Sequence, residues 1–307
     1  MPAIDISGLK KSYRNVEALR GIDLEVREGE IFGLVGPDGA GKTTLIRLLC
    51  GILTPSDGTA TILGSDVRGD PEGVKRRIGY MSQRFSLYQD MTVAENMRFF
   101  EELYSVPPQE RTERRRRLLE FSRLGPFSGR RAGKLSGGMK QKLGLSCALI
   151  HTPKVLFLDE PTTGVDPISR RELWGLLGDL WHGGMTIFVS TPYMDEAERC
   201  NRLAFIQEGR LIAVGTPDEI KADYPYEIAE VVTAGARELA ASLRDSEAIS
   251  ALHLYGDRLH ISLGDYDSGT AELAPLLEAH GIGLSDIRRI EPTLESVFLH
   301  RVEESRR

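Results

Sequence analysis

The sequence predicts an α/β fold in which helices cover a mostly parallel sheet, followed by a small α+β domain. Two observations indicate the main fold. Short apolar strands alternate with helical segments through most of the 307 residues, and a glycine-rich loop joins an early apolar strand to a helix. Alternating strands and helices form crossover connections, which make neighbouring strands parallel. A chain of this length can form one large domain and one small domain.

The glycine-rich loop spans residues 36–44 and reads Gly-Pro-Asp-Gly-Ala-Gly-Lys-Thr-Thr. It fits the phosphate-binding pattern G-x-x-x-x-G-K-S/T at every fixed position. Between an apolar strand at 31–35 and a helix at 45–49, the loop would point its N–H groups at an anion. Lys42 would then reach the β- and γ-phosphates of a nucleotide, and Thr43 would ligate Mg²⁺. The alternative is a glycine-rich turn that only links strand and helix.

The other elements of the large domain follow from the spacing of apolar residues and the position of turn residues. Strands are expected at 4–9, 18–26, 58–64, 76–83, 154–160 and 185–191, and in a hairpin at 203–206 and 211–214. The first two strands precede the loop and would form a separate β subdomain. Helices are expected at 94–104 and 109–124, inside a mainly helical segment of about residues 84–152.

A domain boundary is expected around Tyr224-Pro225, which divides the chain into residues 1–223 and 224–307. Beyond it, the expected order is strand, helix, paired strands, helix and strand, which is similar to a small ferredoxin-like α+β unit. These elements span 227–233, 237–244, 251–255, 259–263, 270–280 and 284–290. A helix at 294–302 would close the chain.

Composition limits the classes of function. The net charge of −6 argues against a nucleic-acid-binding surface. The three cysteines lie far apart, at 50, 147 and 200, so neither a disulfide nor a zinc site is expected. Residues 1–9 have no long apolar core, and no apolar run approaches the roughly 18 residues that span a bilayer. We therefore expect no signal peptide and no membrane-spanning helix.

The densest run of charge is Arg114-Arg115-Arg116-Arg117. Glutamates at 110, 113 and 120 lie at helical spacing from these arginines, so we interpret the run as a solvated helix face. A contact with lipid headgroups or with nucleic acid is the alternative.

Two further features carry chemistry. The strand at 154–160 ends in Asp159 and Glu160. Two carboxylates at the end of an apolar strand are hard to explain as packing, because burying their charge without a cation is costly. Ahead of this strand lies Leu135-Ser136-Gly137-Gly138-Met139-Lys140-Gln141, in which Ser136 is a candidate N-cap for a helix from Met139.

This last segment resembles the signature motif of ATP-binding-cassette (ABC) proteins. A phosphate loop alone would leave kinases, GTPases and motor ATPases open. With the signature segment, the order and spacing of five motifs match the ABC family from residue 1 to about residue 223. The resemblance implies a P-loop NTPase fold of the ABC ATPase type, with a mixed sheet, an antiparallel β subdomain and a helical subdomain.

The resemblance implies ATP and Mg²⁺ as cofactors and assigns roles to individual residues. Glu160 would be the general base, and Lys42 and Gln83 would complete the catalytic group. Asp159, Thr43 and Gln83 would hold Mg²⁺. The residues expected to bind ATP are Tyr13, Gly36, Asp38, Gly39, Ala40, Gly41, Lys42, Thr43, Thr44, Ser136, Gly137, Gly138 and Asp166.

Some of these residues also have simpler interpretations. Tyr13 would stack on adenine, but taken alone it would be ordinary packing in the β subdomain. Gln83 would sense Mg²⁺ and the attacking water, but taken alone it would be a satisfied polar residue at a strand end. Ser136 can cap its helix and still contact a phosphate, since a helix N-terminus favours an anion.

The resemblance also implies partners. Residues 136–138 would contact the γ-phosphate of ATP held by a second cassette, and the loop at Asp166 would cross a head-to-tail dimer, homomeric or heteromeric. The loop after Gln83 would contact a membrane-spanning subunit. Residues 290–299, Ile-Glu-Pro-Thr-Leu-Glu-Ser-Val-Phe-Leu, resemble the ending of cassettes that pair with ABC-2-type permeases. The implied function is the ATP-hydrolysing subunit of an exporter, peripheral on the cytoplasmic face of the membrane, without nucleic acid.

Two positions depart from the family pattern. Where the family has a histidine after the strand at 185–191, this chain has Pro192, which offers neither a titratable group nor an N–H. One hypothesis is that this chain binds ATP but hydrolyses it slowly, so that a partner cassette supplies the competent site or this cassette is purely regulatory. The other hypothesis is that Glu160 suffices for hydrolysis without the histidine. Asp38 replaces the commoner asparagine or serine and would weaken phosphate binding if it points inward. A soluble, non-transport ABC ATPase is the remaining alternative.

Overall fold

A computed structural model describes residues 2–84, 86–244, 246–283 and 286–305. The chain forms two compact units, Met1–Thr216 and Pro217–Arg307. The first unit ends at residue 216, where the sequence suggested 223, because helix α8 (Pro217–Ala222) packs against helix α11 (Leu294–Ser305) of the second unit. Within the described ranges, the structure has no helix with the length and apolar character needed to cross a bilayer.

A six-stranded sheet forms the centre of the first unit, in the order β10-β9-β3-β8-β7-β6. Its neighbouring strands are parallel except for β10, which pairs antiparallel with β9. The strands are β3 (Ile31–Val35), β6 (Ile78–Met81), β7 (Val155–Asp159), β8 (Thr186–Thr191), β9 (Arg202–Gln207) and β10 (Arg210–Gly215). The predicted mostly parallel sheet and its closing hairpin are therefore confirmed.

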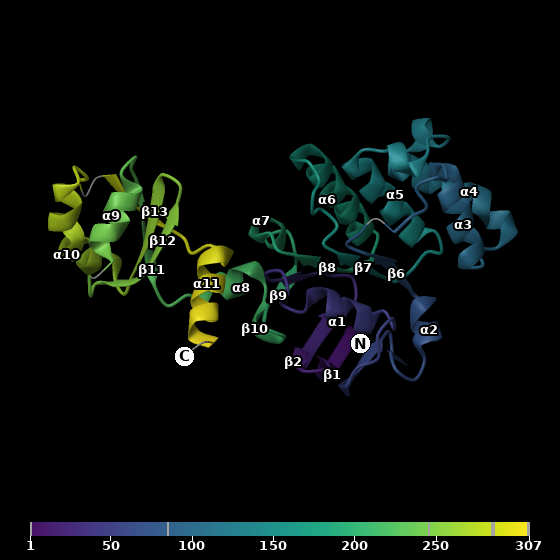
Figure 1. The fold of residues 1–307 in the computed structure, drawn as a ribbon, viewed down its shortest axis with the longest axis horizontal. Coiled ribbons are helices and arrows are strands. Elements are labelled where there is room, and N and C mark those ends of the chain that lie inside the picture. Colours follow the sequence, from purple (N-terminus) through teal and green to yellow (C-terminus); the bar gives the residue numbers. More distant parts are fainter. Residues whose placement is uncertain (1, 85, 245, 284–285, 306–307) are drawn as a thin grey trace. The chain divides into compact units, whose positions relative to one another are not determined.

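Helix α1 (Lys42–Leu49) lies between this sheet and a second, antiparallel sheet, as Figure 1 shows. The second sheet has the order β2-β1-β4-β5, with strands β1 (Pro2–Tyr13), β2 (Val16–Arg27), β4 (Asp57–Ile62) and β5 (Ser65–Asp66). Apolar residues of α1 and of both sheets share one buried cluster. The opposite face of the six-stranded sheet is covered by α5 (Gly137–Leu149) and α6 (Pro167–His182). The short helices α2 (Pro71–Lys75) and α7 (Met194–Ala197) follow β5 and β8.

The predicted helical segment contains α3 (Val93–Leu103) and α4 (Pro108–Phe121) before α5. Thr92 and Glu95 form a reciprocal capping box that starts α3. The predicted second helix was expected to reach residue 124, but α4 ends at Phe121 because the backbone turns at Arg123, where φ is +58°. Short 3₁₀ turns at Gly125–Phe127 and Ala132–Lys134 lead to α5.

The arginine run lies on α4 and forms ion pairs with glutamates. Three arginines pair along the helix as predicted, in the pairs Arg114–Glu110, Arg116–Glu113, Arg116–Glu120 and Arg117–Glu113. The fourth, Arg115, instead reaches Glu101 on α3, with Nη1 2.7 Å from a carboxylate oxygen. Glu101 is buried, so this pair fixes how α4 sits on α3.

The second unit contains a four-stranded antiparallel sheet in the order β12-β13-β11-β14. Its elements are β11 (Glu227–Val232), α9 (Ala236–Leu243), β12 (Ile249–Tyr255), β13 (Arg258–Leu263), α10 (Tyr266–Ala279) and β14 (Ile287–Ile290). Their order along the chain is the predicted one, and α9 and α10 share a core with one face of the sheet. The predicted start of the last strand, at residue 284, lies outside the described residues.

A row of buried phenylalanines crosses the centre of the six-stranded sheet. Phe188 of β8 is in register with Phe32 of β3 on one side and with Phe157 of β7 on the other. Its ring centroid lies 5.6 Å from each of theirs, and all three side chains are fully buried. The row thus joins the strands that lead to the phosphate loop, the carboxylate pair and Pro192.

We predict that Phe188→Ala lowers the free energy of unfolding of the first unit by about 3–5 kcal/mol, because it leaves a cavity between two aromatic neighbours. Urea unfolding followed by tryptophan fluorescence measures the change. Val16→Ala, at an exposed position of β2, is the control and should change the free energy by less than about 0.5 kcal/mol. A loss below about 1 kcal/mol for Phe188→Ala would mean that the row contributes little.

Candidate functional site

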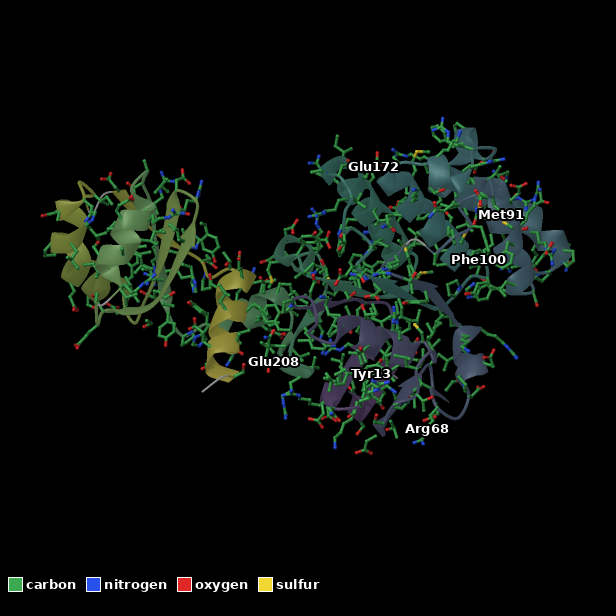
Figure 2. All side chains as sticks on the ribbon, in the orientation of Figure 1. Tyr13, Arg68, Met91, Phe100, Glu172 and Glu208 are labelled. Atoms are coloured by element: carbon green, nitrogen blue, oxygen red, sulfur yellow. The ribbon has the colours of Figure 1, made fainter. Side chains whose placement is uncertain are left out.

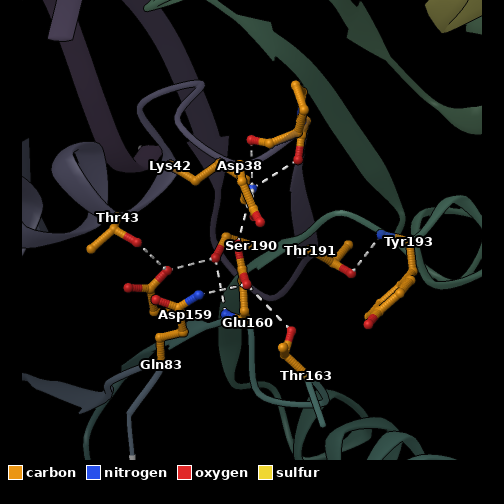
Figure 3. Close-up of polar contacts among 12 residues, drawn as sticks. Asp38, Lys42, Thr43, Gln83, Asp159, Glu160, Thr163, Ser190, Thr191 and Tyr193 are labelled. Carbon is orange, nitrogen blue, oxygen red and sulfur yellow. Dashed lines mark hydrogen bonds and ion pairs between the residues drawn. The ribbon is translucent and has the colours of Figure 1, made fainter.

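Three parallel strands end at the same edge of the six-stranded sheet and bring the predicted site residues together. Val35 of β3 is in register with Thr191 of β8, and Asp159 of β7 with Ser190 of β8. The phosphate loop at 36–44 follows β3, and its residues reach the carboxylate pair that ends β7 across the end of β8. Figure 3 shows the polar contacts of this edge.

The phosphate loop needs glycine at two positions. A side chain at Gly36 would place its Cβ 2.2 Å from the carbonyl oxygen of Ile206. Gly41 has φ of +111°, and a Cβ there would lie 2.8 Å from the carbonyl oxygen of Ala18. The loop can thus lie close to its neighbours and turn into α1, whose N-terminal N–H groups then face the loop's interior.

Lys42 is buried at the start of α1 and faces the loop. Its Nζ donates to the carbonyl oxygens of Gly36 and Pro37, at 2.8 and 2.9 Å. It also pairs with Glu160 Oε1 at 3.0 Å. Asp38 lies nearby, with Oδ1 4.0 Å from Lys42 Nζ, but its side chain is 92% exposed. The Asp38 carboxylate therefore does not occupy the loop's interior.

Asp159 is fully buried and offers one free oxygen. Its Oδ1 accepts hydrogen bonds from Ser190 Oγ at 2.9 Å and from Thr43 Oγ1 at 3.1 Å. Its Oδ2 is buried without a hydrogen-bond partner among the described residues. Burial raises the pKa of Asp159 above its ordinary value, while the bonds from Ser190 and Thr43 oppose that shift. A buried carboxylate oxygen without a partner, beside a threonine hydroxyl, fits the oxygen ligands that Mg²⁺ prefers.

Glu160 is held in a strained backbone conformation. Its φ is +49°, which costs a non-glycine residue about 1–3 kcal/mol. Its N–H donates to Ser190 Oγ at 3.0 Å. Its Oε2 accepts from Gln83 Nε2 at 2.8 Å and from Thr163 Oγ1 at 3.3 Å, and Oε1 pairs with Lys42. These contacts fix both oxygens of one carboxylate at the mouth of the phosphate loop.

Two residues of this site, Ser190 and Thr163, were not predicted from the sequence. Ser190 joins both carboxylate residues, because it accepts from the Glu160 N–H and donates to Asp159. A signal for it was present, since β7 and β8 were both predicted and parallel strands end at one edge. Thr163 follows Glu160 by three residues, but the turn that brings its hydroxyl to the carboxylate could not be predicted from the sequence.

The structure places Tyr13 and the remaining loop residues as follows. Tyr13, labelled in Figure 2, ends β1 with 44% of its surface exposed. The Lys11 ammonium lies 5.2 Å from its ring centroid. Within residues 2–84, no hydrogen bond or ring contact joins Tyr13 to the loop. Ala40 is buried, and its carbonyl oxygen accepts from Gly209 N at 3.0 Å. The three other predicted positions, Gly39, Thr43 and Thr44, lie in the loop or the first turn of α1.

The signature residues and Asp166 form a second group. Ser136 caps α5 by accepting from Met139 N at 3.3 Å, which confirms the predicted cap, although α5 begins at Gly137. Asp166 caps α6 by accepting from Ser169 N at 2.9 Å, and this bond lowers its pKa. Gly138 packs on Ser169, where an added Cβ would approach within 2.3 Å. This group is exposed at Ser136, Gly137 and Asp166.

Pro192 lies between Thr191, which is bonded to the phosphate loop, and Tyr193, which is bonded to Thr191. The carbonyl oxygen of Thr191 accepts from Gly36 N at 3.4 Å, and Thr191 Oγ1 accepts from Tyr193 N at 3.1 Å. Pro192 itself is half-buried at a bend after β8. The position beside the phosphate loop is therefore occupied by a residue without a side-chain donor.

Comparison with known proteins relates this chain to transporter cassettes. The family model described as ABC transporter matches residues 19–163. The probable multidrug ABC transporter ATP-binding protein YbhF of Escherichia coli is 50% identical over 216 residues, and this match covers 70% of the chain and 37% of that protein. The chain thus spans little more than a third of YbhF. The daunorubicin resistance ATP-binding protein DrrA3 of Streptomyces coeruleorubidus is 36% identical over 99% of this chain and 97% of that protein.

Solved structures agree with the fold. The structure of cbiO1 from Clostridium perfringens, described as part of the ABC transporter complex cbiONQ, matches with a TM-score of 0.67 and 28% identity, over 72% of this chain and 91% of that one. The match to DrrA3 runs through nearly all of both chains. The chain therefore belongs to the ABC transporter family, as one of its ATP-binding cassette proteins.

Proposed function

We propose that this chain hydrolyses ATP to drive an exporter, and that it works as a dimer on a separate ABC-2-type membrane subunit at the cytoplasmic face. The observation that carries the proposal is the meeting of the phosphate loop with Asp159 and Glu160 at one sheet edge. The relatives named for multidrug transport and daunorubicin resistance support export. The closing segment at 290–299 supports an ABC-2-type partner.

The residues present fit ATP and Mg²⁺. Backbone N–H groups at the start of α1, together with Lys42, would hold the phosphates. Thr43, the partnerless Oδ2 of Asp159 and Gln83 would hold Mg²⁺. When bound, Mg²⁺ would supply positive charge that neutralises the charge developing on the phosphates. Tyr13 would stack on the adenine, since its ring is exposed.

Glu160 would act as the general base that takes a proton from the attacking water. Gln83 and Thr163 bind one of its oxygens, which orients the carboxylate. Lys42 binds the other oxygen at 3.0 Å. Once Lys42 turns to a phosphate, that oxygen loses its cation and becomes the freer proton acceptor. The same lysine would thus both bind the nucleotide and release the base.

The group at Ser136–Gly138 and Asp166 would serve a second cassette. Ser136, Gly137 and Asp166 are exposed, and within the described residues no hydrogen bond or ion pair ties them to the chain's own phosphate loop. In a head-to-tail dimer, these residues would face ATP held by the partner, at the N-terminus of α5. ATP would favour the closed dimer over the open one, which couples binding to a change of shape. The partner cassette can be a second copy or a different chain.

Pro192 favours a second candidate function. A cassette that binds ATP without turning it over would regulate a partner rather than drive transport. Proline next to the phosphate loop removes the donor that the family places there, so the lost contact would cost roughly 10²-fold in rate. The carboxylate held by Lys42, Gln83 and Thr163 favours the hydrolytic alternative.

Replacing Glu160 by glutamine should lower the rate of ATP hydrolysis by at least about 10²-fold, because the amide cannot accept the proton from water. ATP binding, measured with a fluorescent nucleotide, should change little. Glu25→Gln, at an exposed position of β2, is the matched control. Equal turnover by Glu160→Gln and the unchanged chain would rule out Glu160 as the base.

The Pro192→His variant should hydrolyse ATP about 10²-fold faster than the unchanged chain, since it restores a donor beside the phosphate loop. Steady-state phosphate release, with Glu160→Gln as the blank, measures the gain. Pro192→Ala is the control, because it removes proline without supplying an imidazole. If the unchanged chain already turns over and the histidine adds nothing, the site works without that residue.

The transport part of the proposal predicts a membrane partner. Affinity purification from solubilised membranes should recover a protein with the six spanning helices of an ABC-2-type permease, identified by mass spectrometry. Co-sedimentation with ribosomes, without such a partner, would instead support a soluble, non-transport cassette.

A further inference from the structure

Glu196 is a buried carboxylate with no part in the nucleotide site described above. It belongs to α7, and its side chain is fully buried. Thr191 Oγ1 donates to Glu196 Oε2 at 2.6 Å. The other oxygen, Oε1, lies 3.5 Å from Arg170 Nε, and neither atom has a hydrogen-bond partner in the described parts of the chain. Because a buried charge needs a partner, Arg170 is the counter-charge that the structure places beside Glu196.

Arg170 contacts three residues of the segment that follows Pro192. Its guanidinium carbon lies 4.2 Å from the ring centroid of Tyr193, and its Nη1 lies 3.7 Å from Asp195 Oδ2. With Glu196, one cation thus contacts three residues of this segment. A planar guanidinium can pair with carboxylates and stack on a ring at once, which a lysine cannot do as well.

Arg170 also belongs to the helix that begins at the Asp166 loop. It lies near the start of α6, and its backbone N–H donates to the carbonyl oxygen of Asp166 at 2.9 Å. At the other end, Thr191 accepts from the N–H of Gly36 in the phosphate loop. Contacts therefore run without a break from Asp166 through Arg170, Glu196 and Thr191 to Gly36.

We propose that Arg170 is a positioning residue that ties the Asp166 loop to the phosphate loop through Glu196 and Thr191. The proposal rests on the proposed function, because it concerns regulation of the same site. Pro192 itself has no N–H to donate, so at this bend the chain is held by its neighbours, through the Tyr193 N–H to Thr191 Oγ1 and the contacts of Arg170.

The distance between Arg170 and Glu196 is longer than that of a charge-assisted hydrogen bond, so the pair can still shorten. Nε and Oε1 are 3.5 Å apart, whereas a charge-assisted hydrogen bond measures about 2.7–2.9 Å. A shift of α6 by less than about 1 Å would close the gap. If a second cassette displaced the Asp166 loop and α6 toward α7, the pair would shorten and the displacement would reach Thr191 and the phosphate loop. Dimer formation would thereby alter the position of the phosphate loop.

The test compares Arg170→Ala with Arg171→Ala. Arg171 is the next residue of α6 and is exposed, so its variant makes the same charge change without touching the segment. Arg170→Ala should lower kcat by about 10-fold to 10²-fold with a smaller change in KM, since misplaced groups slow the reaction more than they weaken binding. Hydrogen exchange should become faster in residues 190–198 of Arg170→Ala. Arg171→Ala should match the unchanged chain in both measurements.

A double variant separates positioning from stability. Arg170→Ala leaves the Glu196 charge buried without its partner, which lowers the melting temperature by itself. Arg170→Met with Glu196→Gln removes that charge. We expect the melting temperature to recover while kcat stays low and exchange in residues 190–198 stays fast. Recovery of kcat together with the melting temperature would overturn the proposal.

The exchange measurement also separates this proposal from the proposed function. If neither the unchanged chain nor Pro192→His hydrolyses ATP, the proposed function fails. Exchange in residues 190–198 still decides the role of Arg170 in that case. Equal exchange in Arg170→Ala and the unchanged chain would show that Arg170 does not position the segment.

Discussion

The register of β3, β7 and β8 is the constraint on which the site depends. Parallel strands with fixed pairing place the ends of β3 and β7 on either side of β8, so that the phosphate loop meets Asp159 and Glu160. A slip of one residue would turn each side chain to the other face of the sheet, and Asp159 would lose both of its donors. The phenylalanine row on the same strands resists such a slip, because a shift of one residue would separate the three rings that are in register here.

Charge is concentrated at this edge and is only partly balanced. Lys42, Asp159 and Glu160 are all nearly or fully buried, so one cation faces two carboxylates within a few ångströms. Hydrogen bonds from Thr43, Gln83 and Ser190 stabilise the carboxylates but add no charge. A divalent cation would offset the remaining negative charge, and the buried Oδ2 of Asp159, without a hydrogen-bond partner among the described residues, is an oxygen that could ligate it.

Local patterns in the sequence predicted what depends on local structure. The phosphate loop, the carboxylate pair and the cap at Ser136 each follow from a few consecutive residues, and the strand and helix order follows from apolar spacing. Contacts between distant segments could not be predicted in this way. Ser190 binds Asp159 because of the strand register, and Arg115 of α4 reaches Glu101 of α3. Arg170 of α6 likewise contacts Glu196 of α7. The division of the units at residue 216 depends on the packing of α8 against α11, which apolar spacing does not reveal.

The positive φ of Glu160 has a consequence for substitutions at this position. Glycine adopts this conformation without strain and asparagine with little, so either residue at position 160 would relieve the backbone strain that Glu160 bears. Either would also remove the carboxylate that Lys42, Gln83 and Thr163 surround. The backbone strain and the carboxylate of the proposed general base therefore belong to one residue, and a substitution that relieves the first removes the second.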